Sequence, residues 1–200
     1  MRKRGAVGAE SRQRLLEAAV EEFAHRGFHQ TKISTIVAKA GVTQPAFYLY
    51  FANKEAAFAE LVNEFRRGFT EVVRQSHVPP GKNQGDLKWS VVEGLEQIYH
   101  YLGSHPDLTK IGLFEAAEAT EIKAEVARLM EQNLIEEQQA GYFRQDVDTE
   151  FFAESLLGIV ERLTLIKLLP GLESPLTLAQ QTQDLFFYGI LDVAKRGENT

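Results

Sequence analysis

The side chains whose types and spacing could carry chemistry are concentrated between residues 33 and 51. Two short apolar stretches there are separated by Gly41, Val42 and Thr43, and a short glycine-containing turn between two short helices is the helix-turn-helix pattern. Phe47 and Phe51 lie four residues apart and are expected to point inward. The side chains around them are small or can form hydrogen bonds, and solvent can reach them: Gln44, Ala46, Tyr48 and Tyr50. A helix this short fits a DNA major groove, which is about 12 Å wide.

Each residue of the turn has a physical reason to be there. Ala40 keeps the closest point between the two helices small, and Gly41 can adopt the left-handed backbone that the bend needs. Val42 can fill the core between the helices. Thr43 can cap the second helix and could also reach a phosphate. The alternative is a three-helix bundle with the same turn that binds no DNA.

Other reactive groups do not form a recognisable site. The chain has no cysteine, which excludes disulfides, thiolate metal sites and thiol catalysis. Glu115 and Glu118 lie three apart, and we interpret them as solvated surface. The phosphate-binding, dinucleotide-binding and nucleophile-elbow motifs are absent. We therefore expect no enzyme, no cofactor and no metal site, although the chain has five histidines: His25, His29, His77, His100 and His105.

Charge is distributed unevenly along the 200 residues, whose net charge is −6. The first 54 residues hold nine Lys and Arg against four Asp and Glu, a net charge of +5, and the remainder carries −11. A basic N-terminal part on an acidic remainder indicates contact with phosphates. The alternative is a basic tail on an ordinary helical protein. The basic start is not followed by an apolar segment, and no apolar run approaches the roughly 20 residues of a membrane helix, so a cytoplasmic protein without a membrane partner is expected.

The elements that must position these residues are predicted to be helices throughout. Residues 1–10 are predicted to be a flexible basic arm, and 77–85 a loop. Capping residues are expected at Ser11, Thr43, Asn53, Asp148 and Ser174. The fold class is all-α with about nine helices, predicted at 11–27, 32–40, 44–50, 53–75, 87–102, a short one from Pro106, 121–139, 148–168 and 175–195.

The last two predicted helices carry more large apolar residues than one inward stripe needs. A second buried face, as at a dimer interface, would explain the excess. The alternative is that both helices are central to the monomer. The residues assigned to the interface are Phe152, Leu156, Ile159, Leu163, Leu185 and Phe186.

Three stretches resemble motifs of the tetracycline-repressor (TetR) family. Residues 23–31 resemble the family's F-x-x-x-G-[YF]-x-x-T, residues 40–43 its A-G-V-[ST] turn, and residues 47–55 its [LF]-Y-x-[YH]-F-x-x-K-[ED]. Together they cover about residues 11–61, and in combination they are highly specific. Residues 141–148 are similar to the family's link into its first dimerisation helix.

The resemblance implies a DNA-binding domain over residues 1–54 and a helical effector-binding and dimerisation domain over 55–200. The first three helices would form the DNA-binding domain, the fourth would link it to the body, and the last two would form a four-helix interface with a second copy. The sequence departs from the family at Pro45-Ala46, where many members carry Lys-Gly, and this leaves the base preference open.

The resemblance also implies roles for single residues. Gln44, Pro45 and Ala46 occupy positions that usually face bases; Gln44 could pair with adenine, and Pro45 or Ala46 could contact a thymine methyl. The positions that match contacts to phosphates or base edges complete the predicted DNA-binding set: Thr31, Lys32, Thr43, Tyr48, Tyr50 and Lys54.

A pocket for a small lipophilic ligand is expected among the middle helices, which enclose the ligand in this family. Glu161 could face that pocket and meet a cation, although an ion pair with Arg162 is the plainer interpretation. Ordinary core packing is the alternative for the aromatic residues that we assign to the pocket: Phe65, Phe69, Trp89, Tyr99 and Phe114, with Tyr101 nearby.

The predicted function is a homodimeric repressor that binds a palindromic double-stranded operator and is released by an unidentified small-molecule effector. Two alternatives are open. One is a dimeric DNA-binding regulator without an effector, and the other is an enzyme on a helical body with a vestigial DNA-binding domain.

Overall fold

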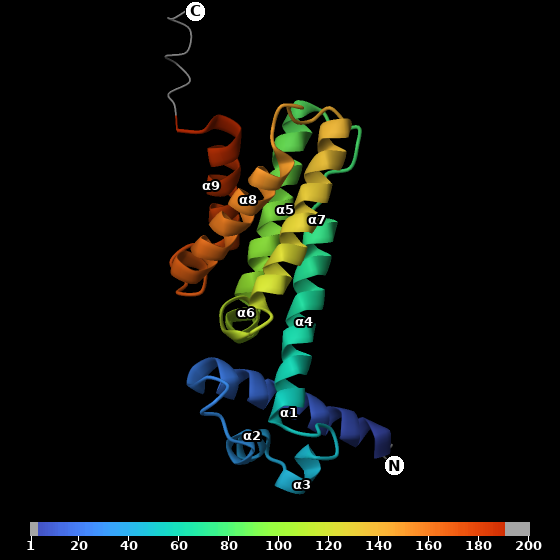
Figure 1. The fold of residues 1–200 in the computed structure, drawn as a ribbon, viewed down its shortest axis with the longest axis vertical. Coiled ribbons are helices and arrows are strands. Elements are labelled where there is room, and N and C mark those ends of the chain that lie inside the picture. The colour runs from blue at the N-terminus through green and yellow to red at the C-terminus, as the bar shows by residue number, and fades with distance from the viewer. Residues whose placement is uncertain (1–3, 191–200) are drawn as a thin grey trace, which may run out of the picture. The chain divides into compact units, whose positions relative to one another are not determined.

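The described part of the chain, residues 4–190 of a computed structural model, is helical and contains no strand (Figure 1). This confirms the predicted all-α class with nine helices. Two single π-helical turns, η1 (Ile111–Glu115) and η2 (Thr164–Leu168), follow the sixth and eighth helices. The helices are α1 (Arg4–Arg26), α2 (Ile33–Ala40), α3 (Gln44–Phe47), α4 (Lys54–Gln75), α5 (Gln84–Ser104), α6 (Pro106–Lys110), α7 (Ala119–Gln139), α8 (Thr149–Leu163) and α9 (Pro175–Tyr188).

The helices form two compact units. The N-terminal unit comprises residues 4–68 and 105–123, and the C-terminal unit comprises 69–104 and 124–190. Helix α4 contributes residues to both units. The predicted domains, residues 1–54 for DNA binding and 55–200 for effector binding and dimerisation, are defined by function, and this division stays a prediction.

Local capping chemistry sets several helix starts as predicted. Asn53 Oδ1 accepts the Ala56 N–H at 2.8 Å, Asp148 Oδ1 accepts the Phe151 N–H at 3.0 Å, and Ser174 Oγ accepts the Thr177 N–H at 3.1 Å. These bonds each satisfy an N–H that lacks a partner within its own helix.

One predicted helix start and one predicted capping hydrogen bond are wrong. Helix α1 begins at Arg4 rather than at Ser11, so residues 4–10 are helical and not a flexible arm. No proline in that stretch stops the helix from extending backward. Thr43 takes the N-cap position of α3 with an extended backbone, but its side chain makes no capping hydrogen bond.

Aromatic rings form much of the core of the N-terminal unit. Phe23 is fully buried and meets Phe58 edge-on at 5.1 Å between ring centroids, and Phe28 lies 4.8 Å from the same ring. Phe65 of α4 packs against Gly112 of η1 so closely that a Cβ on Gly112 would lie 2.0 Å from Phe65 Cδ1. Only glycine therefore fits at position 112.

In the C-terminal unit, α5 and α9 lie side by side (Figure 1). The buried Tyr99 hydroxyl of α5 is 3.1 Å from Thr182 Oγ1 of α9, and burial raises the pKa of Tyr99. Helix α9 ends at Tyr188, and the predicted continuation over residues 191–195 lies outside the described residues. Among residues 4–190, no helix is long and apolar enough to cross a membrane.

Candidate nucleic-acid interface

The turn between α2 and α3 is built as its residues predict. Gly41 has φ +65°, the left-handed backbone that glycine adopts without steric cost. The Val42 N–H then donates to the Val37 carbonyl oxygen at 3.0 Å, which closes the end of α2. Phe47 is 0% exposed and Phe51 3% exposed, so the short helix α3 is anchored from beneath.

The outer surface of α3 and the turn after it carries most of the predicted DNA-binding set. Thr43, Gln44 and Pro45 are exposed, and Tyr48 is 50% exposed. Ala46 and Tyr50 are partly exposed, and Lys32, before α2, is exposed. The residues from Thr43 to Tyr50 share one rigid support, because the buried Phe47 and Phe51 hold the backbone that carries them.

Leu49 belongs to the same surface and is not among the predicted DNA-binding residues. Its side chain is 79% exposed, more than that of Tyr48 beside it. The available signal was its place midway between the two inward-facing residues Phe47 and Phe51. A large apolar side chain held in solvent is informative when its neighbours are candidates for binding.

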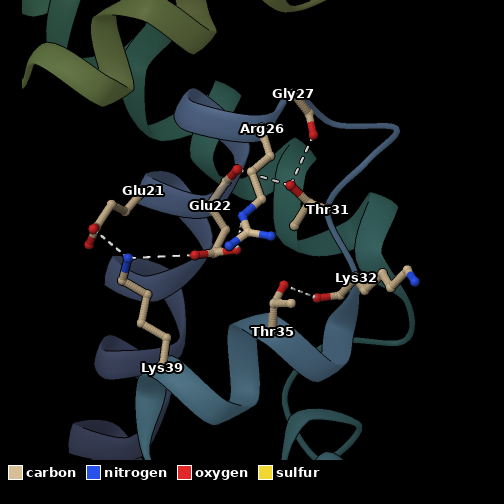
Figure 2. Close-up of polar contacts among 8 residues, drawn as sticks. All are labelled: Glu21, Glu22, Arg26, Gly27, Thr31, Lys32, Thr35 and Lys39. Atoms are coloured by element: carbon tan, nitrogen blue, oxygen red, sulfur yellow. Dashed lines mark hydrogen bonds and ion pairs between the residues drawn. The ribbon is translucent and has the colours of Figure 1, made fainter.

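Thr31, a predicted phosphate contact, is buried and hydrogen-bonded within the protein. Its side chain is 2% exposed, and its hydroxyl lies 3.0 Å from the Glu22 carbonyl oxygen and 2.9 Å from that of Gly27 (Figure 2). A hydroxyl in this position joins the end of α1 to the start of α2. It is not available to an external phosphate in this structure.

Lys54 is likewise turned inward. Its Nζ donates to the carbonyl oxygens of Phe28, at 2.7 Å, and Thr31, at 3.0 Å. The same ammonium group lies 4.3 Å from the centroid of the Phe28 ring, which is cation–π geometry. Lys54 therefore fixes the loop between α1 and α2 to the start of α4.

Two further basic side chains of this unit form ion pairs with acidic residues of α1. Lys39 of α2 pairs with Glu21 and lies 3.6 Å from Glu22, and Arg26 Nε is 3.0 Å from Glu22 Oε2 (Figure 2). The hydrogen bond with Glu21 raises the pKa of Lys39. Lys39 thus holds α2 to α1, and Arg26 pairs within α1, whereas the Lys32 side chain points away from the cluster (Figure 2).

The residues predicted to form a ligand pocket are distributed over both units. Phe65 and Phe114 belong to the N-terminal unit, and Phe114 lies under Lys123 Nζ at 5.9 Å. In the C-terminal unit, Phe69 is buried and its ring is stacked parallel to that of Tyr101, with 6.3 Å between centroids. Tyr99 is buried against α9, Trp89 is 62% exposed, and Glu161 is partly exposed.

The C-terminal unit has a groove of about 1270 Å³, and none of those six predicted residues lines it. Its walls come from α5, α7, α8 and α9 and are mainly apolar. The groove has no local sequence signal, because four helices distant in the chain supply most of its walls. Representative lining residues are Leu95, Ile98, Met130, Leu134, Leu156 and Phe186.

Two buried polar side chains line this groove, Glu137 and Gln183. Glu137 Oε1 accepts the Val78 N–H at 2.9 Å. Burial raises the pKa of Glu137 to about 7, and the neighbouring charge of Glu136 adds to the rise, while the Val78 hydrogen bond opposes it.

The residues predicted to form a dimer interface lie on α8 and α9 and are all at least partly exposed in the single chain. Leu185 is 43% exposed, and the Phe152 and Phe186 rings contact each other at 4.7 Å. Phe152, Leu156 and Phe186 also line the groove. Ile159 and Leu163 of α8 complete the set. As to metal binding, residues 4–190 contain no group of three potential ligands close enough to hold an ion.

The anchored α3 with its exposed face defines a helix-turn-helix regulator of transcription, and comparison with known proteins agrees. Residues 15–61 match the model of the bacterial regulatory proteins of the tetR family. An uncharacterised transcriptional regulator, YdgC of Bacillus subtilis, is 44% identical over 184 residues, 92% of this chain and 94% of that protein. The chain belongs to the TetR family, whose members bind DNA and are dimers.

Two more distant relatives are informative. The transcriptional repressor DhaR of a Mycobacterium species is 24% identical over 152 residues, 74% of this chain and 77% of that protein. The crystal structure of FadR from Bacillus subtilis, in complex with stearoyl-CoA, has a TM-score of 0.69 at 20% identity and covers 90% of this chain and 99% of that one.

Proposed function

We propose that this chain is a dimeric repressor that binds a palindromic operator through α3 and is released from it by a small lipophilic ligand. The observation that carries the proposal is the exposed surface of α3, mounted on the buried Phe47 and Phe51. The name of the relative DhaR, a repressor, supports the direction of regulation.

In this proposal the exposed residues divide into base contacts and phosphate contacts. Gln44 can bond bidentately to the N6 and N7 atoms of adenine. Pro45, Ala46 and Leu49 offer apolar surface to thymine methyl groups. The phosphate contacts are Lys32, Thr43, Tyr48 and Tyr50.

Thr31 and Lys54 act indirectly. Their hydrogen bonds to the carbonyl oxygens of Glu22, Gly27 and Phe28 fix the helices that present the exposed surface. We therefore propose them as positioning residues, in place of the direct DNA contacts that the family resemblance implies.

Dimerisation is proposed to use the apolar faces of α8 and α9. A dimer that presents two copies of α3 one helical turn apart, roughly 34–36 Å, would read two half-sites related by a two-fold axis. The two-fold symmetry of the protein would then match a palindromic operator.

The groove of the C-terminal unit is the proposed ligand site. Its volume and apolar walls suit a lipophilic compound, and the FadR structure, of the same fold, holds a long-chain acyl thioester. Because coupling is reciprocal, ligand and operator would weaken each other's binding by one factor, typically 5–150-fold. In this proposal residues 1–54 bind DNA, and 55–200 bind the effector and the second copy.

The test is selection of bound duplexes from a random library at two salt concentrations, with the wild type and two variants. We expect enrichment of one palindrome, weaker binding at higher salt, and an altered base preference at one position of each half-site for Gln44→Ala. The matched control is Gln97→Ala, an exposed glutamine of α5, which should select the wild-type palindrome. A folded dimer that enriches no sequence would refute the proposal.

A further inference from the structure

The groove of the C-terminal unit contains a buried hydrogen-bond donor without an acceptor. Gln183 of α9 lines the groove and is 1% exposed, and its Nε2 has no hydrogen-bond partner. Glu137, the other buried polar side chain of the lining, already bonds to the Val78 N–H. Nearly all buried polar groups in native proteins form hydrogen bonds, so we expect Gln183 Nε2 to donate to an acceptor outside the single chain.

The backbone that carries Gln183 is held on both sides. The preceding residue, Thr182, is fixed to Tyr99 by the 3.1 Å hydrogen bond between their hydroxyls. The following residue, Asp184, is 3.7 Å from Lys88 Nζ. Both partners belong to α5, and the buried Tyr99–Thr182 hydrogen bond, more than the exposed ion pair, orients this turn of α9 before any ligand arrives. A preorganised donor contributes to affinity without a cost for ordering it.

The surroundings of the donor define the chemistry of its partner. The walls are mainly apolar, which suits hydrocarbon, while Nε2 can only donate and needs an acceptor atom. A carbonyl oxygen accepts without bringing a proton of its own that would need another partner. A hydroxyl group would introduce such a proton.

We infer that Gln183 is a specificity-determining residue of this groove: its Nε2 donates to the carbonyl oxygen of a lipophilic acyl ligand whose hydrocarbon chain lies along the apolar walls. This inference rests on the proposed function, because it names the ligand class of the same groove. It goes further in assigning recognition of the acyl carbonyl to one side chain.

The experiment compares two probes that differ only in that carbonyl, palmitoyl-CoA and S-hexadecyl-CoA. Binding of each to the full-length protein is measured by titration calorimetry. The wild type is expected to bind palmitoyl-CoA roughly three- to tenfold more tightly, the range of one net hydrogen bond. In Gln183→Met, which keeps the side-chain length, that preference should vanish, while S-hexadecyl-CoA should bind within twofold of the wild type.

Two further variants control for structural damage. Gln180→Met changes an exposed glutamine of the same helix and should keep the wild-type preference. Gln183→Leu gives a second apolar replacement and should lose the preference as Gln183→Met does. Removal of an unpaired buried donor does not weaken the fold, so both Gln183 variants should melt at or above the wild-type temperature.

The outcomes separate this inference from the proposed function. Equal affinity of the wild type for both probes, binding of neither, or a preference that survives in the Gln183 variants would overturn the inference. So would a changed dimer dissociation constant with an unchanged preference, because the carboxamide would then face a second copy of the chain. Operator release is measured separately by fluorescence anisotropy, and preferential binding without release would refute the proposed regulation alone.

Discussion

The ammonium group of Lys54 is held by two carbonyl oxygens and a ring, so its loss should weaken folding more than DNA binding. Lys54→Met should lower the free energy of unfolding by about 1–2 kcal/mol, because two hydrogen bonds to a charged donor disappear. The measurement is urea denaturation of the purified protein.

Lys32→Met is the matched control, because Lys32 is exposed and points away from the ion-pair cluster (Figure 2). Its stability should stay within about 0.5 kcal/mol of the wild type. The slope of log operator affinity against log salt concentration should become shallower by about one unit, as expected for the loss of one phosphate contact. If Lys54→Met instead kept wild-type stability and showed the same change in salt-dependence slope, Lys54 would be a DNA contact.

Glu137 should make the protein less stable as the pH rises toward neutrality. Its folded-state pKa of about 7 lies above the ordinary value of 4.5, so between these values the folded state binds more protons than the unfolded state. The contribution of Glu137 to the free energy of unfolding therefore falls from about pH 4.5 to pH 7 and no longer changes above pH 7. Glu137→Gln should remove this slope and raise the free energy of unfolding at pH 8 by up to about 3 kcal/mol.

The control for this prediction is Glu136→Gln. Glu136 is exposed, and its Oε2 lies 3.1 Å from His77 Nε2. Its replacement leaves Glu137 buried and should keep most of the slope. Denaturation at a series of pH values distinguishes the two carboxylates, and an unchanged slope in Glu137→Gln would show that the Glu137 carboxyl does not titrate as the burial implies.

At the scale of elements, η1 meets α4 at a position where only glycine fits. Gly112→Ala should destabilise the protein by about 2 kcal/mol or more, because its Cβ would overlap the Phe65 ring. Adding Phe65→Leu should recover part of the loss, because a smaller side chain makes room. A thermal unfolding cycle of the two single variants and the double variant measures this coupling.

Gly158→Ala in α8 is the matched control. Nothing lies within 4 Å of a Cβ built at Gly158, and the residue is within a helix. This substitution should be neutral or stabilising by up to about 1 kcal/mol. A Gly112 variant as stable as the Gly158 variant would mean that η1 can move away from Phe65 at little cost.

Elements were predicted best where the determinants are local. Asn53, Asp148 and Ser174 cap their helices as predicted, because a cap involves only the next three residues. The π-helical turns η1 and η2 continue an apolar pattern that the 3.6-residue period does not distinguish from ordinary helix. They were therefore not predicted.

Residues whose partners are distant in the chain were predicted less well. The acceptors of Lys54 lie 23 and 26 residues earlier, and the local sequence does not indicate them; the family resemblance implied a DNA contact instead. The groove depends on four helices, and its unpaired donor, Gln183, has no sequence signal beyond its place in an apolar helix. Trp89 shows the reverse, since its aromatic type suggested a pocket and its side chain is 62% exposed.

At the scale of the whole molecule, the exposed apolar residues of α8 and α9 lead to the last prediction. Leu185 is 43% exposed in the single chain and belongs to the proposed interface. In a two-fold symmetric dimer each substitution occurs twice, so Leu185→Glu would bring two charges into one apolar contact. The dimer dissociation constant, measured by analytical ultracentrifugation, should rise at least about tenfold, since burying even one unpaired charge costs more than 1.4 kcal/mol.

Operator binding should fall with dimerisation in that variant, although Leu185 lies outside the N-terminal unit that carries α3. Two linked DNA-binding units engage two half-sites with a far higher effective concentration than two separate ones. Raising the protein concentration should therefore restore operator binding in parallel with the dimer. The control Ile135→Glu, at an exposed apolar residue of α7, should leave both constants unchanged. A Leu185→Glu protein that stays dimeric would place the interface on another face.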